Sequence, residues 1–190
     1  WLWARSLGIS ARGALMSALA YMLAPRILAH LGAGHLDLLY AAAWWPWLMW
    51  AAGRPGAGGW RWSLLTGLFA GLVVLADVRL ALYALPCAAL AFVIRWQQGG
   101  RSWKVLAFGG LSAALAIGLA ASVLVPVTAW SPRMTRAALV PAETGAGLLS
   151  AGGLAGLIVP AASASGQETL TYLGIVTLLA QAPLHLALTH

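Results

Sequence analysis

Residues 63–94 read SLLTGLFAGLVVLADVRLALYALPCAALAFVI, two apolar runs that meet at Asp77-Val78-Arg79. As one helix the stretch would be about 48 Å long at ~1.5 Å per residue, whereas the hydrocarbon core of a bilayer measures about 30 Å. Charged residues in the middle of such a helix are costly and are usually functional or interfacial. The stretch therefore predicts a pair of helices with Asp77 and Arg79 at the turn between them.

Basic residues flank this stretch on both sides. Positive charge near membrane segments favours the cytoplasmic side, so both ends are predicted there, with Asp77 and Arg79 at the external tip of a hairpin. The flanking basic residues are Arg54, Arg61, Arg95, Arg101 and Lys104. Four tryptophans lie at the same level, where interfacial aromatic residues gather: Trp60, Trp62, Trp96 and Trp103.

The composition is that of an integral membrane protein. Hydrophobic residues make up 62% and charged residues 8%, against about 25% charged residues in soluble domains. The net charge of +7 is dispersed between apolar runs, so we expect contact with membrane lipids and no nucleic acid partner. Cys87 is the single cysteine, which excludes a disulfide within the chain.

We expect an all-α fold, a polytopic integral membrane protein of about six transmembrane helices with one single domain over 1–190. Pro25 predicts a kink or break near Ala24. The external loop 131–167 contains an apolar piece too short to span, predicted to be interfacial or re-entrant. Because the chain opens on Trp1 and stops just after an apolar run, we expect a segment of a longer chain. The predicted spans are 12–31, 36–52, 63–76, 80–95, 103–128 and 170–189.

The hairpin sets the sides of all the other segments. Segments 53–62 and 95–104 are predicted to be cytoplasmic, and segments 32–36, 77–79 and 131–168 external. Every acidic residue then falls on the external face, together with two histidines, so the polar chemistry is predicted there. These residues are Asp37, Asp77, Glu143, Glu168, His30 and His35.

Asp77 and Arg79 allow two interpretations. In the first they form a solvated turn in which Asp77 caps the following helix. In the second they form a wall of an external cavity, where Arg79 binds a phosphate or carboxylate and Asp77 orients Arg79's ligand or acts on a substrate hydroxyl. Asp37 and Asp77 are accordingly the candidate catalytic carboxylates.

Other external residues could bind phosphate. Arg133 and Arg136 share a face if their segment is helical, which suits a phosphate headgroup and equally suits an exposed loop. His35 is a further candidate for substrate binding. His30 and His35 are five residues apart across a glycine turn, a spacing that does not place them together, so we expect an interfacial polar turn and no metal site.

Several short motifs resemble those of a known family. Tyr21-x-x-x-Pro25, Gly34-His35 and a helix with Trp45-Pro46 are similar to the central portion of YfhO-like bacterial membrane proteins, which are related to the GT-C glycosyltransferases. Asp77-x-Arg79-x-x-x-Tyr83 and Tyr172-Leu173-Gly174 resemble the same group. The likeness covers most of the chain in pieces.

The resemblance implies transfer of a sugar from a polyprenyl-phosphate donor on the external face of the bacterial inner membrane. GT-C enzymes carry their acceptor-activating acidic motif in the first external loop, yet no acidic residue precedes Asp37 here. Either that motif, with any divalent metal it would bind, lies outside this sequence, or the protein is not catalytic. The alternative function is a non-catalytic structural subunit that packs against other membrane subunits; no cofactor is expected from the present sequence.

Overall fold

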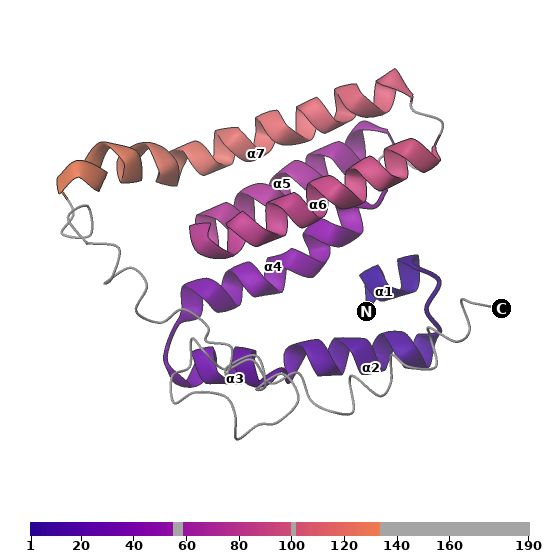
Figure 1. Cartoon of the computed structure of the whole chain (residues 1–190), viewed down its shortest axis with the longest axis horizontal. Coiled ribbons are helices and arrows are strands. Elements are labelled where there is room, and N and C mark those ends of the chain that lie inside the picture. Colours follow the sequence, from indigo (N-terminus) through magenta and orange to yellow (C-terminus); the bar gives the residue numbers. More distant parts are fainter. Residues whose placement is uncertain (55–58, 100–101, 134–190) are drawn as a thin grey trace, which may run out of the picture. The chain divides into compact units, whose positions relative to one another are not determined.

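The computed structural model describes residues 1–54, 59–99 and 102–133. All regular secondary structure in these ranges is helical, as the sequence predicts (Figure 1). Among the described residues, three helical stretches are long and apolar enough to cross a membrane: Ala11–Gly32, Val78–Gln98 and Trp103–Arg133. Trp60–Ala76 is also apolar but shorter.

The chain divides into two compact units, and the first includes residues Ser10–His35. It contains α2 (Ala11–Met22) and α3 (Pro25–Gly32). Ser10 caps α2, because its hydroxyl accepts a hydrogen bond from the backbone N–H of Gly13 at 3.2 Å. Pro25 occupies the first turn of α3, where its missing N–H does no harm. The helix break predicted near Ala24 is confirmed.

A Schellman turn ends α3. Gly34 has a φ of +74°, which glycine adopts without strain. The N–H of His35 donates to the carbonyl of His30 at 3.0 Å, and the N–H of Gly34 donates to that of Leu31 at 3.1 Å. This hydrogen-bond pair folds His35 back over the last turn of α3.

The second unit covers Leu2–Ile9 and Leu36–Ala137, of which the structure describes the part up to Arg133. In it α4 packs on α5 and α6, α5 packs on α7, and α1 contacts α4. The helices α4, α5, α6 and α7 run alternately up and down, so the ends of neighbouring helices gather at two opposite ends of the bundle (Figure 1). The elements are α1 (Leu2–Ser6), α4 (Leu36–Ala52), α5 (Trp60–Ala76), α6 (Val78–Gln98), α7 (Trp103–Trp130) and the short 3-10 helix η1 (Ser131–Arg133).

Residues 63–94 form parts of two helices joined at Asp77. Asp77 has an extended backbone, with φ −152° and ψ 111°, and it ends α5 and begins α6. Helix α6 runs to Gln98 and is therefore longer than the 80–95 predicted. Pro86 lies inside it without ending it.

Small residues bring α5 and α7 into close contact. A Cβ at Gly67 would lie 2.6 Å from the backbone oxygen of Ser112, and one at Gly71 would lie 2.6 Å from Leu119 Cδ1. The hydroxyl of Ser112 donates across the contact to the carbonyl of Ser63 at 2.9 Å. Small residues at a helix–helix contact allow the two backbones to approach each other closely in this way.

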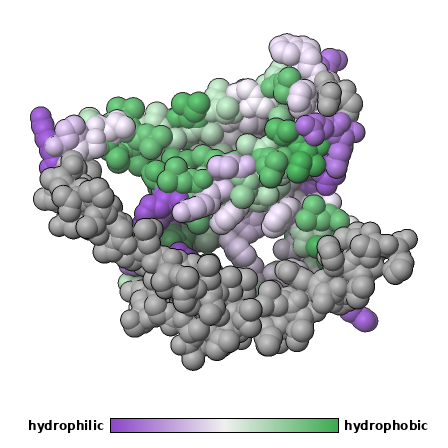
Figure 2. All heavy atoms as spheres, in the orientation of Figure 1, coloured by the Kyte–Doolittle hydropathy of each residue, from purple (hydrophilic) through white to green (hydrophobic). Residues whose placement is uncertain are grey.

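The distribution of apolar side chains is unusual for a water-soluble bundle. The buried cluster of the second unit consists mostly of alanine, with Leu48, Val73 and Val74 as its larger members. Large apolar side chains lie outside instead, such as Leu82 at 70% and Ile117 at 69% exposure. Figure 2 shows hydrophobic residues along α6 and α7, with hydrophilic residues gathered towards the helix ends.

Part of the sequence prediction lies outside the described residues. This holds for the span 170–189 and for the external loop 131–167 beyond Arg133. Arg136, Glu143 and Glu168 belong to these segments. Ser131–Arg133, the start of the predicted loop, forms η1.

Candidate functional site

The best-defined polar cluster begins with Asp77, which caps α6. Its Oδ1 accepts hydrogen bonds from the backbone N–H groups of Arg79 at 2.7 Å and Leu80 at 3.2 Å. These donors have no partner within the helix, and the positive end of the helix dipole favours a carboxylate here. The prediction that Asp77 caps this helix is confirmed, but its side chain is buried and not solvated.

Arg79 joins Asp77 to Asp37 across two helices. Its Nη2 donates to Asp77 Oδ2 at 2.8 Å and to Asp37 Oδ2 at 3.2 Å. Its Nε lies 3.2 and 3.3 Å from the two oxygens of Asp77. The Asp77 side chain is 2% exposed, whereas those of Arg79 and Asp37 are 64% and 54% exposed. The start of α4 is thus tied to the start of α6.

The environment of Asp77 keeps its carboxyl group ionised. Burial by itself raises the pKa, but the hydrogen bonds from the Arg79 side chain and from the backbone N–H groups of Leu80 and Arg79, with the Arg79 charge, outweigh it. The net result is a pKa below the ordinary value of 3.8. Two carboxylates against one guanidinium give this cluster a formal charge of −1.

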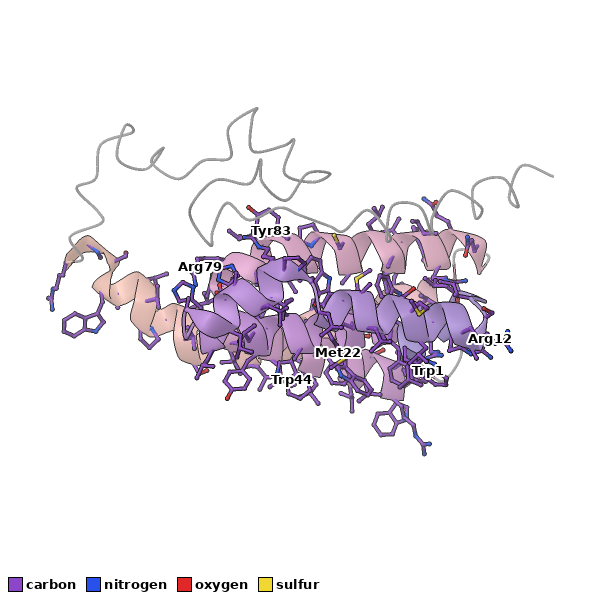
Figure 3. The ribbon with its side chains drawn as sticks, turned by 90° about the horizontal axis from the view of Figure 1, so that it is seen from below. Trp1, Arg12, Met22, Trp44, Arg79 and Tyr83 are labelled. Carbon is purple, nitrogen blue, oxygen red and sulfur yellow. The ribbon has the colours of Figure 1, made fainter. Side chains whose placement is uncertain are left out.

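The surroundings of Arg79 bear on its predicted role as a phosphate ligand. Its guanidinium is already engaged by two carboxylates, which offset its charge. Asp37 keeps an accessible oxygen, because in the described part of the chain its Oδ1 accepts no hydrogen bond. Tyr83 lies one turn further along α6 and is exposed (Figure 3). The cluster therefore exposes both a guanidinium and a carboxylate, and its net charge is negative.

His35 belongs to the first unit, where it contacts His30. Their Nδ1 atoms lie 3.0 Å apart, so one ring donates to the other, and His30 is 2% exposed. The prediction that their spacing would not place them together was wrong, because the Schellman turn at Gly34 adds the bend that a straight helix lacks. The described residues contain no group of three or more His, Cys, Asp or Glu side chains suited to a metal ion.

Arg133, the other described candidate for phosphate binding, lies in η1 at the end of α7. Its guanidinium carbon is 5.2 Å from the centre of the Trp130 ring, a cation–π contact, and both residues are exposed. Arg136, its predicted partner on the same face, lies outside the described residues.

A second organised cluster, which was not predicted from the sequence, lies at the end of α4. The Arg54 guanidinium carbon lies 4.4 Å from the Trp50 ring centre and 4.9 Å from that of Trp62. The two indole rings meet edge to face at 5.0 Å. The abundance of tryptophan near arginine in this part of the sequence indicates that such a cluster could form. Which rings meet could not be predicted, because it depends on how α4 packs on α5.

Comparison with protein-family models, with curated proteins and with solved structures finds no match for this chain.

Proposed function

We propose that this chain belongs to a polytopic membrane protein with glycosyltransferase activity on the external face. The membrane location is supported by the three long apolar helices and by an inverted distribution of side chains. Alanine makes up most of the buried cluster and two glycines of α5 lie at its contact with α7, while many of the larger leucine, isoleucine and valine side chains are exposed. Helices in lipid pack in this way because lipid solvates large apolar side chains as well as a protein core does.

The charges of the second unit support the proposed orientation. Among its described residues, one end carries basic side chains and no acidic one: Arg5, Arg54, Arg61, Arg95 and Lys104. The opposite end carries two acids and two arginines: Asp37, Asp77, Arg79 and Arg133. An excess of basic residues favours the cytoplasmic side, so the Asp37–Arg79–Asp77 cluster would be external.

The proposed activity rests on Asp37. Its carboxylate is 54% exposed and is held by Arg79, whose position is fixed in turn by the buried Asp77. A carboxylate so placed can accept the proton of an acceptor hydroxyl as that hydroxyl attacks the anomeric carbon of a lipid-linked sugar. Asp77 and Arg79 would position it rather than touch the substrate.

The donor in this proposal is a polyprenyl-phosphate sugar, the class that the GT-C resemblance implies. The bond from the anomeric carbon to the phosphate oxygen breaks, and the leaving phosphate needs positive charge. Arg133, at the same end of the second unit as Asp37, is assigned to that role together with Arg136. Arg79 is not, since two carboxylates already engage it.

Sugar transfer in membranes containing the full-length protein tests this proposal. We expect Asp37→Asn to lower turnover by about 100-fold or more, the usual contribution of a general base, with little change in KM for the donor. Asp37→Glu should retain part of the activity, and Arg61→Gln, at the opposite end, should retain all of it. Equal activity in Asp37→Asn and unaltered protein would contradict the assignment of Asp37.

A structural subunit is the second candidate function, and the double pairing of Arg79 favours it. A guanidinium held between Asp37 and Asp77 fastens α4 to the α5–α6 hairpin without any substrate. On this hypothesis, Asp37→Asn lowers the stability of the protein or its retention in a larger membrane complex. Neither the unaltered protein nor the variant transfers sugar. Native gel electrophoresis of solubilised membranes would separate the two functions.

A further inference from the structure

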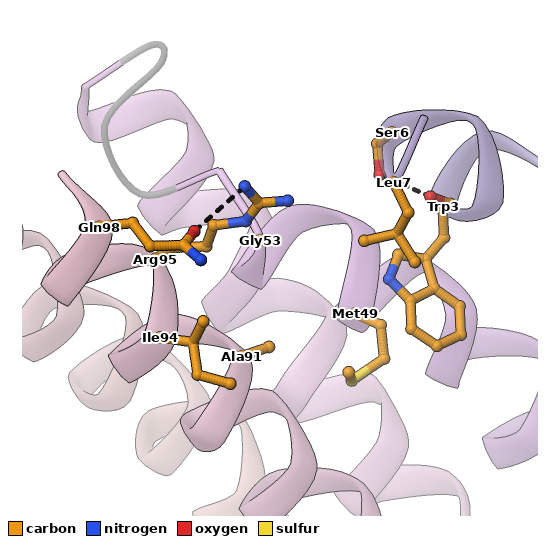
Figure 4. Close-up of a pocket in the computed structure, with 9 residues that line it drawn as sticks. All are labelled: Trp3, Ser6, Leu7, Met49, Gly53, Ala91, Ile94, Arg95 and Gln98. Atoms are coloured by element: carbon orange, nitrogen blue, oxygen red, sulfur yellow. Dashed lines mark hydrogen bonds between the residues drawn. The ribbon is translucent and has the colours of Figure 1, made fainter. Parts of the chain in front are cut away.

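A groove opens between α1, α4 and α6 at the basic end of the second unit (Figure 4). Its volume is about 310 Å³. Residues from all three helices line it, among them Trp3, Leu7, Met49, Ile94, Arg95 and Gln98. It lies far from the Asp37–Arg79–Asp77 cluster, because Arg95 and Asp77 are at opposite ends of α6, about 27 Å apart at ~1.5 Å per residue.

The groove has an apolar part and a polar rim. Trp3, Leu7, Met49 and Ile94 supply apolar side chains, whereas Arg95 and Gln98 project together at one edge (Figure 4). A ligand that fills this groove must therefore combine an apolar chain with a polar group.

The polar rim favours a negatively charged group. Arg95 Nη1 donates to the neutral amide oxygen of Gln98 at 3.4 Å, a long hydrogen bond. The acidic side chains that the structure describes, Asp37 and Asp77, are both at the opposite end of the bundle. Asp77 is about 27 Å from Arg95 and Asp37 lies at that same far end, so neither forms an ion pair with Arg95.

We propose that this groove binds an anionic phospholipid, with its phosphodiester against Arg95 and an acyl chain along Leu7, Met49 and Ile94. The guanidinium offers paired N–H donors that match phosphate oxygens. Basic pockets between membrane helices on the cytoplasmic side suit such headgroups. This inference rests on the membrane location proposed above but not on the glycosyltransferase activity.

Native mass spectrometry of the detergent-solubilised full chain tests the site, with phosphatidylglycerol titrated against phosphatidylcholine. We expect phosphatidylglycerol to be retained preferentially and Arg95→Gln to weaken its binding about fivefold, the usual contribution of one basic residue near anionic lipid. Arg61→Gln is the matched control, since Arg61 is a basic residue at the same end that does not line the groove. Equal losses in the two variants would overturn the site, because they would indicate general surface attraction.

A second variant keeps every charge. Ala91 lines the groove, and Ala91→Phe should fill it and displace the lipid. Two results would contradict the proposal: undiminished phosphatidylglycerol binding in Ala91→Phe, or full displacement of the lipid by soluble glycerol phosphate. Either result would mean that the apolar part of the groove does not contribute to binding. Alkaline carbonate extraction distinguishes failure of the proposed membrane location from failure of the lipid site. Release of the chain from membranes would overturn both. Retention in the membrane without lipid preference overturns the site alone.

Discussion

Asp77 accepts hydrogen bonds from both the backbone and the side chain of Arg79, two residues further along the chain. The backbone N–H donates to Oδ1 at 2.7 Å, and Nη2 donates to Oδ2 at 2.8 Å. One buried carboxylate therefore begins α6 and also fixes the guanidinium that reaches Asp37 on α4. The local helix cap and the long-range ion pair depend on the same side chain.

This double role predicts that Asp77→Ala destabilises the folded chain more than Asp77→Asn does. Alanine removes the cap and the ion pair, and loss of a cap alone costs about 1 kcal/mol, up to about 2. Asparagine is a good cap and removes only the charge interaction with Arg79, whose own exposure limits its contribution. Thermal unfolding in detergent, followed by circular dichroism, measures both. Equal losses in the two variants would indicate that the cap contributes nothing.

The lowered pKa of Asp77 predicts a stability that depends on pH. A carboxyl group whose pKa is lower in the folded chain stabilises that chain fully above its unfolded pKa, here about 3.8. The stabilisation is lost as the pH falls through the folded pKa, because protonation then removes the interaction with Arg79. We expect Tm to fall below about pH 4, with a shallower fall in Asp77→Asn. Identical pH profiles of the two proteins would show that another group causes the loss.

The cap and the hairpin turn could be predicted from sequence because both are local. An aspartate between two apolar runs, which together are too long for one membrane-spanning helix, predicts that one helix ends and another begins at Asp77. The pairing of Arg79 with Asp37 could not be predicted in this way, since it depends on how α4 packs against α6. The His30–His35 contact was missed for a different reason: periodicity assumes a straight helix, and Gly34 ends it with a positive φ.

The glycines of α5 and α7 differ in a way that sequence alone does not show. A Cβ at Gly67 or Gly71 would collide with α7, whereas nothing lies within 4 Å of one at Gly110 or Gly118. The difference arises because Gly67 and Gly71 face the contact between α5 and α7, while Gly110 and Gly118 are exposed on α7.

We therefore expect Gly67→Ala to destabilise the bundle by about 1–3 kcal/mol, the range for overpacked contacts. At this position the collision is with backbone, 2.6 Å from the Ser112 oxygen, so no side chain can move aside to relieve it. Gly118→Ala is the matched control and should be neutral or stabilising by up to about 1 kcal/mol through its better helix propensity. Thermal unfolding measures the stability of the two variants. Equal effects of the two substitutions would contradict the tight contact between α5 and α7.

The hairpin predicts which segments face the same side of the membrane. With Cys87 replaced by serine, single cysteines at Gly58 and Gly99 should react with a membrane-impermeant maleimide from the cytoplasmic side, and one at Val78 from the external side. The reason is geometric: α5 and α6 are joined by Asp77 alone, so their distant ends return to one end of the bundle. That end carries the basic residues and tryptophans that favour the cytoplasmic interface. Labelling of intact cells measures reactivity from the external side, and labelling of inverted vesicles measures reactivity from the cytoplasmic side. If Gly58 and Gly99 react from different sides, the hairpin does not return across the membrane, and the Asp37–Arg79–Asp77 cluster loses its external assignment.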